Sequence, residues 1–167
     1  ERQFKKKMNN IFDWVKGAEL VELKSCNTKE DPVRPELDVV FRRSYGRKIY
    51  AVIYKKEICA IMCFGFTNEV PKTVKELDLM TRDAYLTSAQ RDQNIGKIAV
   101  AYTVWSKKKG GGKLIVKEVY KMIKKSNHLN RLITLSPLTE MARNFHLHNG
   151  AIELQVNKET QNFEYKI

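Results

Sequence analysis

Two histidines and a nearby serine stand in the part of this chain that points most clearly to chemistry. Ser136 precedes Pro137, and His146 and His148 lie in the segment Phe-His-Leu-His-Asn-Gly-Ala at 145–151. A histidine can give or take a proton near neutral pH. Since residues two apart point to different sides of a helix, only one of the two histidines can face a site. Ser136, directly before Pro137, can act as the cap of the helix that follows.

A glycine-rich basic segment precedes these residues and is suited to binding phosphate. Residues 107–113 read Lys-Lys-Lys-Gly-Gly-Gly-Lys and separate an apolar stretch from an amphipathic pattern. Glycines let backbone amides converge on one small volume, and a helix N-terminus adds positive potential there. The spacing matches neither a P-loop nor a dinucleotide-binding fingerprint. The alternative is a flexible turn without a ligand.

Periodicity predicts the elements that position these side chains. β-Branched and aromatic residues predict strands over 37–41, 49–54, 58–66, 98–105 and 131–135, and the second and third of these form an antiparallel hairpin. Apolar residues at helical spacing predict helices over 3–16, 112–125 and 139–148, and a closing hairpin is predicted over 151–156 and 162–167.

Two segments lack such a pattern. Residues 24–36 read as a loop, and residues 67–97 fit a short helix or strand within a long connection that we expect to cover a site. The second segment carries Glu76, Asp78 and Asp83, which are candidates for a general base.

The composition is typical of one globular domain, which we expect to span residues 1–167. Of the 167 residues, 43% are hydrophobic, and no apolar run approaches the roughly 20 residues of a membrane span. The three cysteines, Cys26, Cys59 and Cys63, argue against a disulfide framework and against a zinc site. We therefore expect a cytoplasmic protein without a metal or membrane attachment.

The net charge of +12 predicts an anionic partner. Lysines line the polar face of the helix predicted over 112–125. A basic nucleic-acid-binding module is therefore one alternative function, although no zinc-finger, RRM or KH motif is present. Its affinity would fall steeply with salt.

The glycine segment and the last helix resemble a known superfamily. Lys107-x-x-Gly110-x-Gly112 resembles the Arg/Gln-x-x-Gly-x-Gly/Ala acyl-coenzyme A motif of the GNAT acyltransferases, with lysine in the first position. Ala142 and Gly150 match the superfamily's pattern Ala-x-x-x-Tyr-x-x-x-Gly-Phe, whose tyrosine position is His146 here. The similar part covers about residues 37–167.

This resemblance implies a fold, a ligand and a set of site residues. The implied fold is α+β (α/β mixed), with a mostly antiparallel twisted sheet flanked by helices. The implied ligand is acetyl-CoA or another acyl-CoA, with its pyrophosphate at the glycine amides and its pantetheine arm along the preceding strand. The residues implied in coenzyme binding are Thr103, Val104, Trp105, Lys107, Lys109, Gly110, Gly111, Gly112 and Lys113. His146 takes the place of the tyrosine that protonates the leaving thiolate, and for this reason we favour His146 over His148 as the reactive histidine.

Two short strings also resemble the catalytic domain of malonyl-CoA decarboxylase, which is built on the same fold. They are Thr-Leu-Ser-Pro at 134–137 and the segment 145–151. By this resemblance Ser136 and His146 are a catalytic pair that protonates the carbon left after carbon dioxide departs.

Three functions follow from the sequence. Acyl transfer from coenzyme A to an amine acceptor is favoured, because transferases are the commoner members of the superfamily. Acyl-CoA decarboxylation by Ser136 and His146 is the second. Nucleic-acid binding, alone or as the carrier of the acceptor, is the third. The sequence leaves the acyl group, the acceptor and the oligomeric state open.

Overall fold

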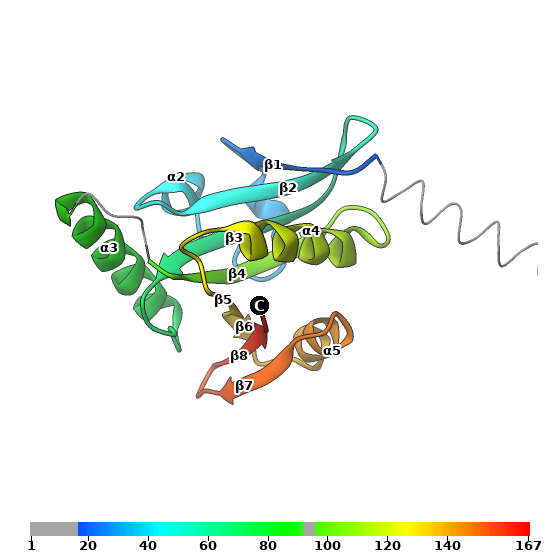
Figure 1. Cartoon of the computed structure of the whole chain (residues 1–167). Coiled ribbons are helices and arrows are strands. Elements are labelled where there is room, and N and C mark those ends of the chain that lie inside the picture. Colours follow the sequence, from blue (N-terminus) through cyan, green and yellow to red (C-terminus); the bar gives the residue numbers. More distant parts are fainter. Residues whose placement is uncertain (1–16, 92–95) are drawn as a thin grey trace, which may run out of the picture.

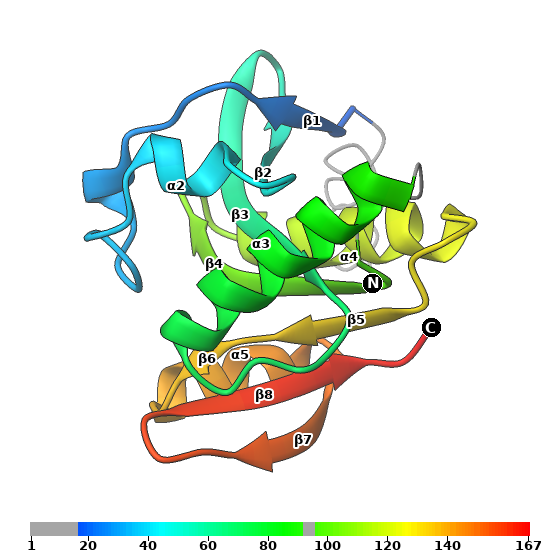
Figure 2. The ribbon, with the colours of Figure 1, turned by 90° about the vertical axis from the view of Figure 1, so that its left-hand side faces the viewer.

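The structure, a computed structural model, describes residues 17–91 and 96–167, so the helix expected over 3–16 lies outside the described residues. An eight-stranded sheet forms the centre, in the order β1-β2-β3-β4-β5-β8-β6, with β7 paired to β8 (Figure 1). Helix α4 packs on one face of this sheet, and helices α2 and α3 pack on the other (Figure 2).

The strands are β1 Glu19–Leu23, β2 Lys48–Tyr54, β3 Glu57–Thr67, β4 Ile98–Ser106, β5 Arg131–Thr134, β6 Ser136–Pro137, β7 Ile152–Val156 and β8 Thr160–Tyr165. The α-helices are α2 Val39–Arg43, α3 Val74–Arg91, α4 Gly111–Lys125 and α5 Glu140–His148, and a short 3-10 helix spans Thr28–Glu30. Only β4 and β5 pair in parallel among the described strands. The predicted mixed class with a mostly antiparallel sheet is confirmed.

The strand predicted over 37–41 is wrong. Its residues begin the short helix α2, because the Asp38 side chain accepts a hydrogen bond from the Phe41 amide at 2.8 Å and so caps the first turn. This local hydrogen bond outweighs the strand preference of the β-branched residues that follow Asp38.

Helix α3 occupies most of residues 67–97, the segment in which the sequence shows no clear pattern. Its buried stripe consists of Leu77, Thr81, Ala84 and Ser88, of which only Leu77 is large and apolar. A Cβ on Gly65 would lie 2.6 Å from Cγ2 of Thr81, so this glycine lets the helix approach β3 closely. Small and polar contacts of this kind leave no apolar period in the sequence.

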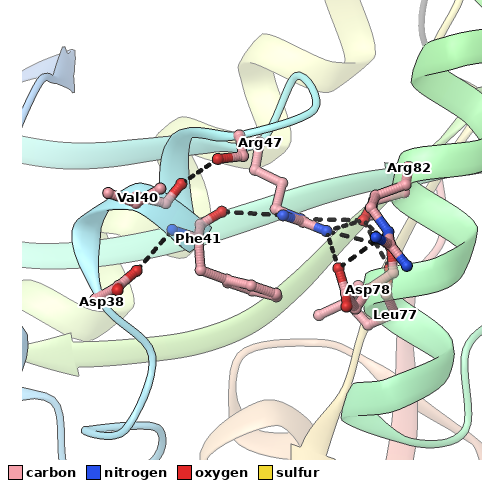
Figure 3. Close-up of polar contacts among 9 residues, drawn as sticks. Asp38, Val40, Phe41, Arg47, Leu77, Asp78 and Arg82 are labelled. Atoms are coloured by element: carbon pink, nitrogen blue, oxygen red, sulfur yellow. Dashed lines mark hydrogen bonds and ion pairs between the residues drawn. The ribbon is translucent and has the colours of Figure 1, made fainter.

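A buried arginine fastens α2 to α3. The Arg47 guanidinium donates to Oγ1 of Thr81 at 2.7 and 3.0 Å, to Oδ1 of Asp78 at 2.7 Å and to the carbonyl of Phe41 at 3.1 Å (Figure 3). Burial lowers the pKa of Arg47, and the neighbouring Asp78 carboxylate opposes that shift. Asp78 therefore balances a buried charge in the fold.

Strands β4 and β5 separate part-way along their length. They pair in parallel from Ile98 and Arg131 to Ala101 and Thr134, and the Leu135 amide still donates to the Ala101 carbonyl at 2.9 Å. Beyond this point the chain leaves β5 to form β6 with β8, while β4 continues along β3. Strand β4 has a bulge at the same level, because Cys63 of β3 pairs with Thr103 whereas Phe64 pairs with Ala101, which leaves one residue of β4 without a partner in β3.

Candidate functional site

A cavity of about 540 Å³ opens where β4 and β5 separate. This volume lies within the usual range for small-molecule sites. The lining residues come from the loop before α2, from β4, from the start of α4 and from the β5–α5 region; they are Glu30, Pro32, Val33, Ala101, Tyr102, Thr103, Val104, Trp105, Ser106, Gly112, Leu135, Ser136, Pro137, Thr139, Met141, Ala142, Phe145 and His146. Among these described residues, Glu30 is the one carboxylate, and no lysine or arginine is present.

The cavity brings together many of the residues that the sequence singled out. Ser136 and His146 both line it, as do Gly112 and the segment 103–105. The remaining predicted coenzyme-binding residues, Lys107, Lys109, Gly110, Gly111 and Lys113, lie in the adjoining turn and the first turn of α4. By contrast, none of the described residues between 67 and 97 lines the cavity, so the expectation that this segment covers a site stays a prediction.

Tyr165 holds His146 at the inner surface of the cavity. The Tyr165 hydroxyl lies 2.8 Å from Nδ1 of His146, and both side chains are only 5% exposed. Burial lowers the pKa of His146 to about 4, so its ring is uncharged at neutral pH. Burial also raises the pKa of Tyr165, whose hydroxyl keeps its proton. Because Nδ1 is occupied by Tyr165, Nε2 is the ring nitrogen available to a ligand.

The second histidine lies outside the cavity. Nδ1 of His148 is 2.9 Å from the Asn144 carbonyl one turn earlier in α5, and its side chain is exposed. This arrangement leaves His146 as the histidine that can act in the cavity.

Ser136 is a cavity residue and does not cap α5. Thr139 caps this helix, since its hydroxyl accepts a hydrogen bond from the Ala142 amide at 3.1 Å. The hydroxyls of Ser136 and Thr134 lie 2.8 Å apart, and Oγ1 of Thr134 also accepts from the Phe163 amide at 3.1 Å. When Thr134 donates to Ser136, the Ser136 proton is free to donate to a ligand.

The glycine turn leaves backbone amides without partners beside the cavity. The amides of Lys107 and Lys108 both donate to the Cys59 carbonyl, at 2.8 and 3.1 Å. The amides of Gly110, Gly112 and Lys113 have no acceptor among the described residues. Three free donors at the N-terminus of α4 form a site suited to a phosphate group.

Close packing around this turn requires its glycines. Gly110 has φ +83°, which is the left-handed region. A Cβ on Gly111 would lie 2.3 Å from the Cys59 carbonyl oxygen, and a Cβ on Gly112 would lie 2.9 Å from Cε2 of Phe145. The turn therefore lies directly against β3 and α5, with its amides uncovered.

A buried ion pair fixes the cavity wall that carries Glu30. Oδ2 of Asp31 lies 2.8 Å from Nη1 of Arg42, and both side chains are buried. The Thr103 hydroxyl donates to Oδ1 of Asp31 at 2.7 Å, which ties the loop to the bulge of β4. Arg42 also donates to the carbonyls of Leu37 at 2.8 Å and Arg34 at 2.6 Å. The Thr103 hydroxyl is therefore occupied within the protein, so its backbone is what it can offer to a coenzyme.

Within the described part of the chain, no group of three His, Cys, Asp or Glu side chains is arranged to hold a metal ion. No helix in that part is long and apolar enough to cross a membrane.

Comparison with known proteins identifies the fold. No protein family and no curated protein matches the chain in sequence. Among solved structures, a GNAT-like decarboxylase named GphF, in complex with isobutyryl-CoA, is similar with a TM-score of 0.63 and 9% identity, over 89% of this chain and 98% of that one. This chain adopts the GNAT fold.

Two further GNAT-fold structures extend the comparison. A Bacillus subtilis acetyltransferase in complex with CoA has a TM-score of 0.59 and 11% identity, over 90% of this chain and 97% of that one. Malonyl-CoA decarboxylase from Cupriavidus metallidurans has a TM-score of 0.64 and 16% identity, over 99% of this chain. This chain spans 65% of that enzyme's chain and 60% of the corresponding enzyme's chain from Rhodopseudomonas palustris.

Proposed function

We propose that this chain is an enzyme that acts on a coenzyme A thioester held in the cavity between β4 and β5. One observation carries the proposal: Gly112 belongs both to the phosphate-type turn and to the lining of the cavity that holds Ser136 and His146. A thioester with its pyrophosphate at the free amides would therefore extend along β4 toward these two side chains. The CoA and isobutyryl-CoA held by two similar structures support this proposal.

The cavity lining favours decarboxylation of a malonyl-type thioester. That reaction requires a proton donor and no base, and Ser136 and His146 are both donors in the lining. A carboxylate paired with a cation would resist leaving as neutral carbon dioxide. The described lining contains no lysine or arginine, so a carboxylate there would meet only neutral donors. Three of the similar structures are decarboxylases, which adds support.

The step balances with the residues present. The bond between the carboxylate carbon and the α-carbon breaks, carbon dioxide leaves, and the electron pair is shared by the α-carbon and the thioester oxygen. Ser136 donates a hydrogen bond to that oxygen, where negative charge develops. In the tautomer with its proton on Nε2, His146 accepts a hydrogen bond from the Tyr165 hydroxyl at Nδ1. His146 gives the Nε2 proton to the α-carbon, and the Tyr165 hydroxyl stabilises the negative charge that this leaves on the ring. The product is the shortened acyl-CoA. His146 regains its proton from water, and the hydroxide that remains combines with the released carbon dioxide to give bicarbonate.

Acyl transfer to an amine is the second candidate, because Glu30 lines the same cavity. A carboxylate at that position can accept the proton of an attacking amine, and the uncharged ring of His146 can donate a hydrogen bond from Nε2 to the leaving thiolate. Glu30 also lies 3.2 Å from Nζ of Lys107, so part of its charge is already balanced. The sequence did not indicate Glu30, and Glu76, Asp78 and Asp83 do not line the cavity.

Nucleic-acid binding remains a third, separate hypothesis. The lysines of α4 are exposed, and among them only Lys121 pairs with a carboxylate in the described structure, Glu118 at 3.4 Å. Binding of an oligonucleotide that weakens steeply with salt would support this hypothesis.

Turnover of malonyl-CoA, followed by mass spectrometry without any amine, tests the proposal. We expect acetyl-CoA to form, and His146→Gln and Ser136→Ala each to slow it by about a hundredfold or more, as loss of a proton donor does. Glu30→Gln should leave this rate unchanged. Turnover that requires an amine and is lost in Glu30→Gln would identify a transferase instead. Failure to bind any CoA thioester would overturn both reactions.

A further inference from the structure

Six lysines gather at the end of the sheet where the glycine turn lies. Lys55 and Lys56 form the turn between β2 and β3, and Lys107, Lys108, Lys109 and Lys113 belong to the β4–α4 turn and the start of α4. An ion pair between Lys108 and Glu57 joins the two turns directly. Both turns lie at the same end of the molecule, on the right of Figure 1. We call these six residues the lysine cluster.

Most of the positive charge in the lysine cluster is unbalanced. Glu57 pairs with Lys108, and Glu30 pairs with Lys107. The other four lysines have no carboxylate partner among the described residues. The ammonium of Lys55 lies 5.4 Å from the centre of the Tyr54 ring, which holds it near the turn by a cation–π contact. Four cations without a carboxylate partner thus lie in the glycine turn and in the hairpin turn that the Lys108–Glu57 ion pair joins to it.

The two lysines of the hairpin are not the residues that such a turn favours. Lys55 has φ +49° and Lys56 has φ +65°, so both adopt the left-handed conformation. A two-residue hairpin turn of this type favours Asn-Gly, because those residues reach positive φ with least strain. Lysine at both positions adds charge at the expense of turn stability, which indicates a role for the charge.

We propose that Lys55 and Lys56, with Lys109, bind the 3′-phosphate of coenzyme A. This inference rests on the proposed function. The three free amides suit the pyrophosphate, whereas a terminal phosphate monoester carries about −1.5 to −2 charges at pH 7 and calls for cations. The 3′-phosphate is present in free coenzyme A and absent from a phosphopantetheine arm on a carrier protein. The lysine cluster therefore selects free acyl-CoA as the acyl carrier.

Calorimetric titration with coenzyme A and with dephospho-coenzyme A tests this inference. The wild-type chain should bind coenzyme A about tenfold more tightly, with a steeper dependence on salt. The double variant Lys55→Asn, Lys56→Gly removes two charges while supplying the preferred turn, so the hairpin should keep its stability. This variant should lose the preference and bind both ligands equally. The control Lys124→Ala, Lys125→Ala removes the same charge at the far end of α4 and should keep the preference.

The outcomes separate this inference from the proposed function. Equal affinity of the wild-type chain for both ligands, removed by bulky residues at Gly110 and Gly112, would overturn the 3′-phosphate site and leave the coenzyme site intact. An equal loss of preference in the Lys124, Lys125 control would show a general effect of charge and would also overturn it. Failure of the wild-type chain to bind either ligand would overturn the proposed function itself.

Discussion

Replacement of Asp31 by asparagine should destabilise this protein far more than loss of an ordinary ion pair. The Asp31 carboxylate is 1% exposed and accepts hydrogen bonds from the Val33 amide at 2.8 Å and the Arg34 amide at 3.1 Å, besides those from Arg42 and Thr103. Asparagine keeps one oxygen for these donors. However, it directs an amide NH₂ group at the guanidinium of Arg42 and leaves that charge buried without compensation.

The expected cost follows from the burial of the pair. Breaking a buried ion pair by removing one partner costs about 3–5 kcal/mol, which is a large part of the about 5–15 kcal/mol that stabilises a typical domain. The pair Glu22–Lys48 is a matched control, because its members lie 3.1 Å apart but are 47% and 38% exposed. Glu22→Gln should cost about 0–1 kcal/mol.

Urea unfolding of both variants measures the difference. With a slope of about 2 kcal/mol per molar urea, Asp31→Asn should lower the midpoint by about 2 M without changing the slope. Glu22→Gln should lower it by less than about 0.5 M. A midpoint for Asp31→Asn within the range of the control would refute the view that this pair fixes the cavity wall.

Three further predictions follow from other contacts. Burial lowers the pKa of His146 from an ordinary 6.5 to about 4, so the unfolded chain takes up this proton at a higher pH than the folded chain. The free energy of unfolding should therefore fall by up to about 3 kcal/mol as the pH drops from 6.5 to 4. Unfolding measured across that range should show a smaller fall in His146→Gln. Gly111→Ala should destabilise the fold by more than Gly150→Ala in thermal unfolding. A Cβ at position 111 would lie 2.3 Å from the Cys59 carbonyl oxygen, whereas a Cβ at position 150 would meet no atom. Gly150→Ala should cost only the strain of its left-handed conformation at φ +98°, which is about 1–2 kcal/mol. Tyr165→Phe removes only the hydroxyl at Nδ1 of His146. It should therefore slow turnover by about tenfold or more and leave the affinity for coenzyme A, measured by calorimetry, unchanged. A lower affinity with an unchanged rate would contradict the role proposed for Tyr165.

Local patterns were sufficient where an element carries its own signal. The hairpin of β2 and β3, strand β4 and helices α4 and α5 lie within one or two residues of their predicted bounds, because alternation, helical spacing and glycine stops mark them. Helix α3 lacks such a signal, since its buried stripe is mostly small or polar. Strand β1 was not predicted, because its register with β2 depends on a partner outside the segment itself.

The residues of the candidate site also divide into those that a local pattern revealed and those that it did not. Ser136, His146 and the glycine turn could be found because each stands in a short motif. Tyr165 and Glu30 could not, because their proposed roles depend on contacts made by distant segments. Tyr165 meets His146 from the other strand of the final hairpin, and the wall that carries Glu30 is fixed by the contact of Asp31 with Thr103, 72 residues away.

The position of β8 in the sheet has a consequence for synthesis. This strand lies between β5 and β6, although it follows both in the sequence. Its Asn162 side chain donates to the carbonyls of Pro71 at 3.0 Å and Thr134 at 2.8 Å, and Tyr165 holds His146. A nascent chain on the ribosome therefore exposes an unpaired edge of β5 until Tyr165 has left the exit tunnel. His146, the proposed proton donor, is held in its position only when translation has passed this strand. An incompletely translated chain should therefore lack the proposed activity and be prone to aggregate.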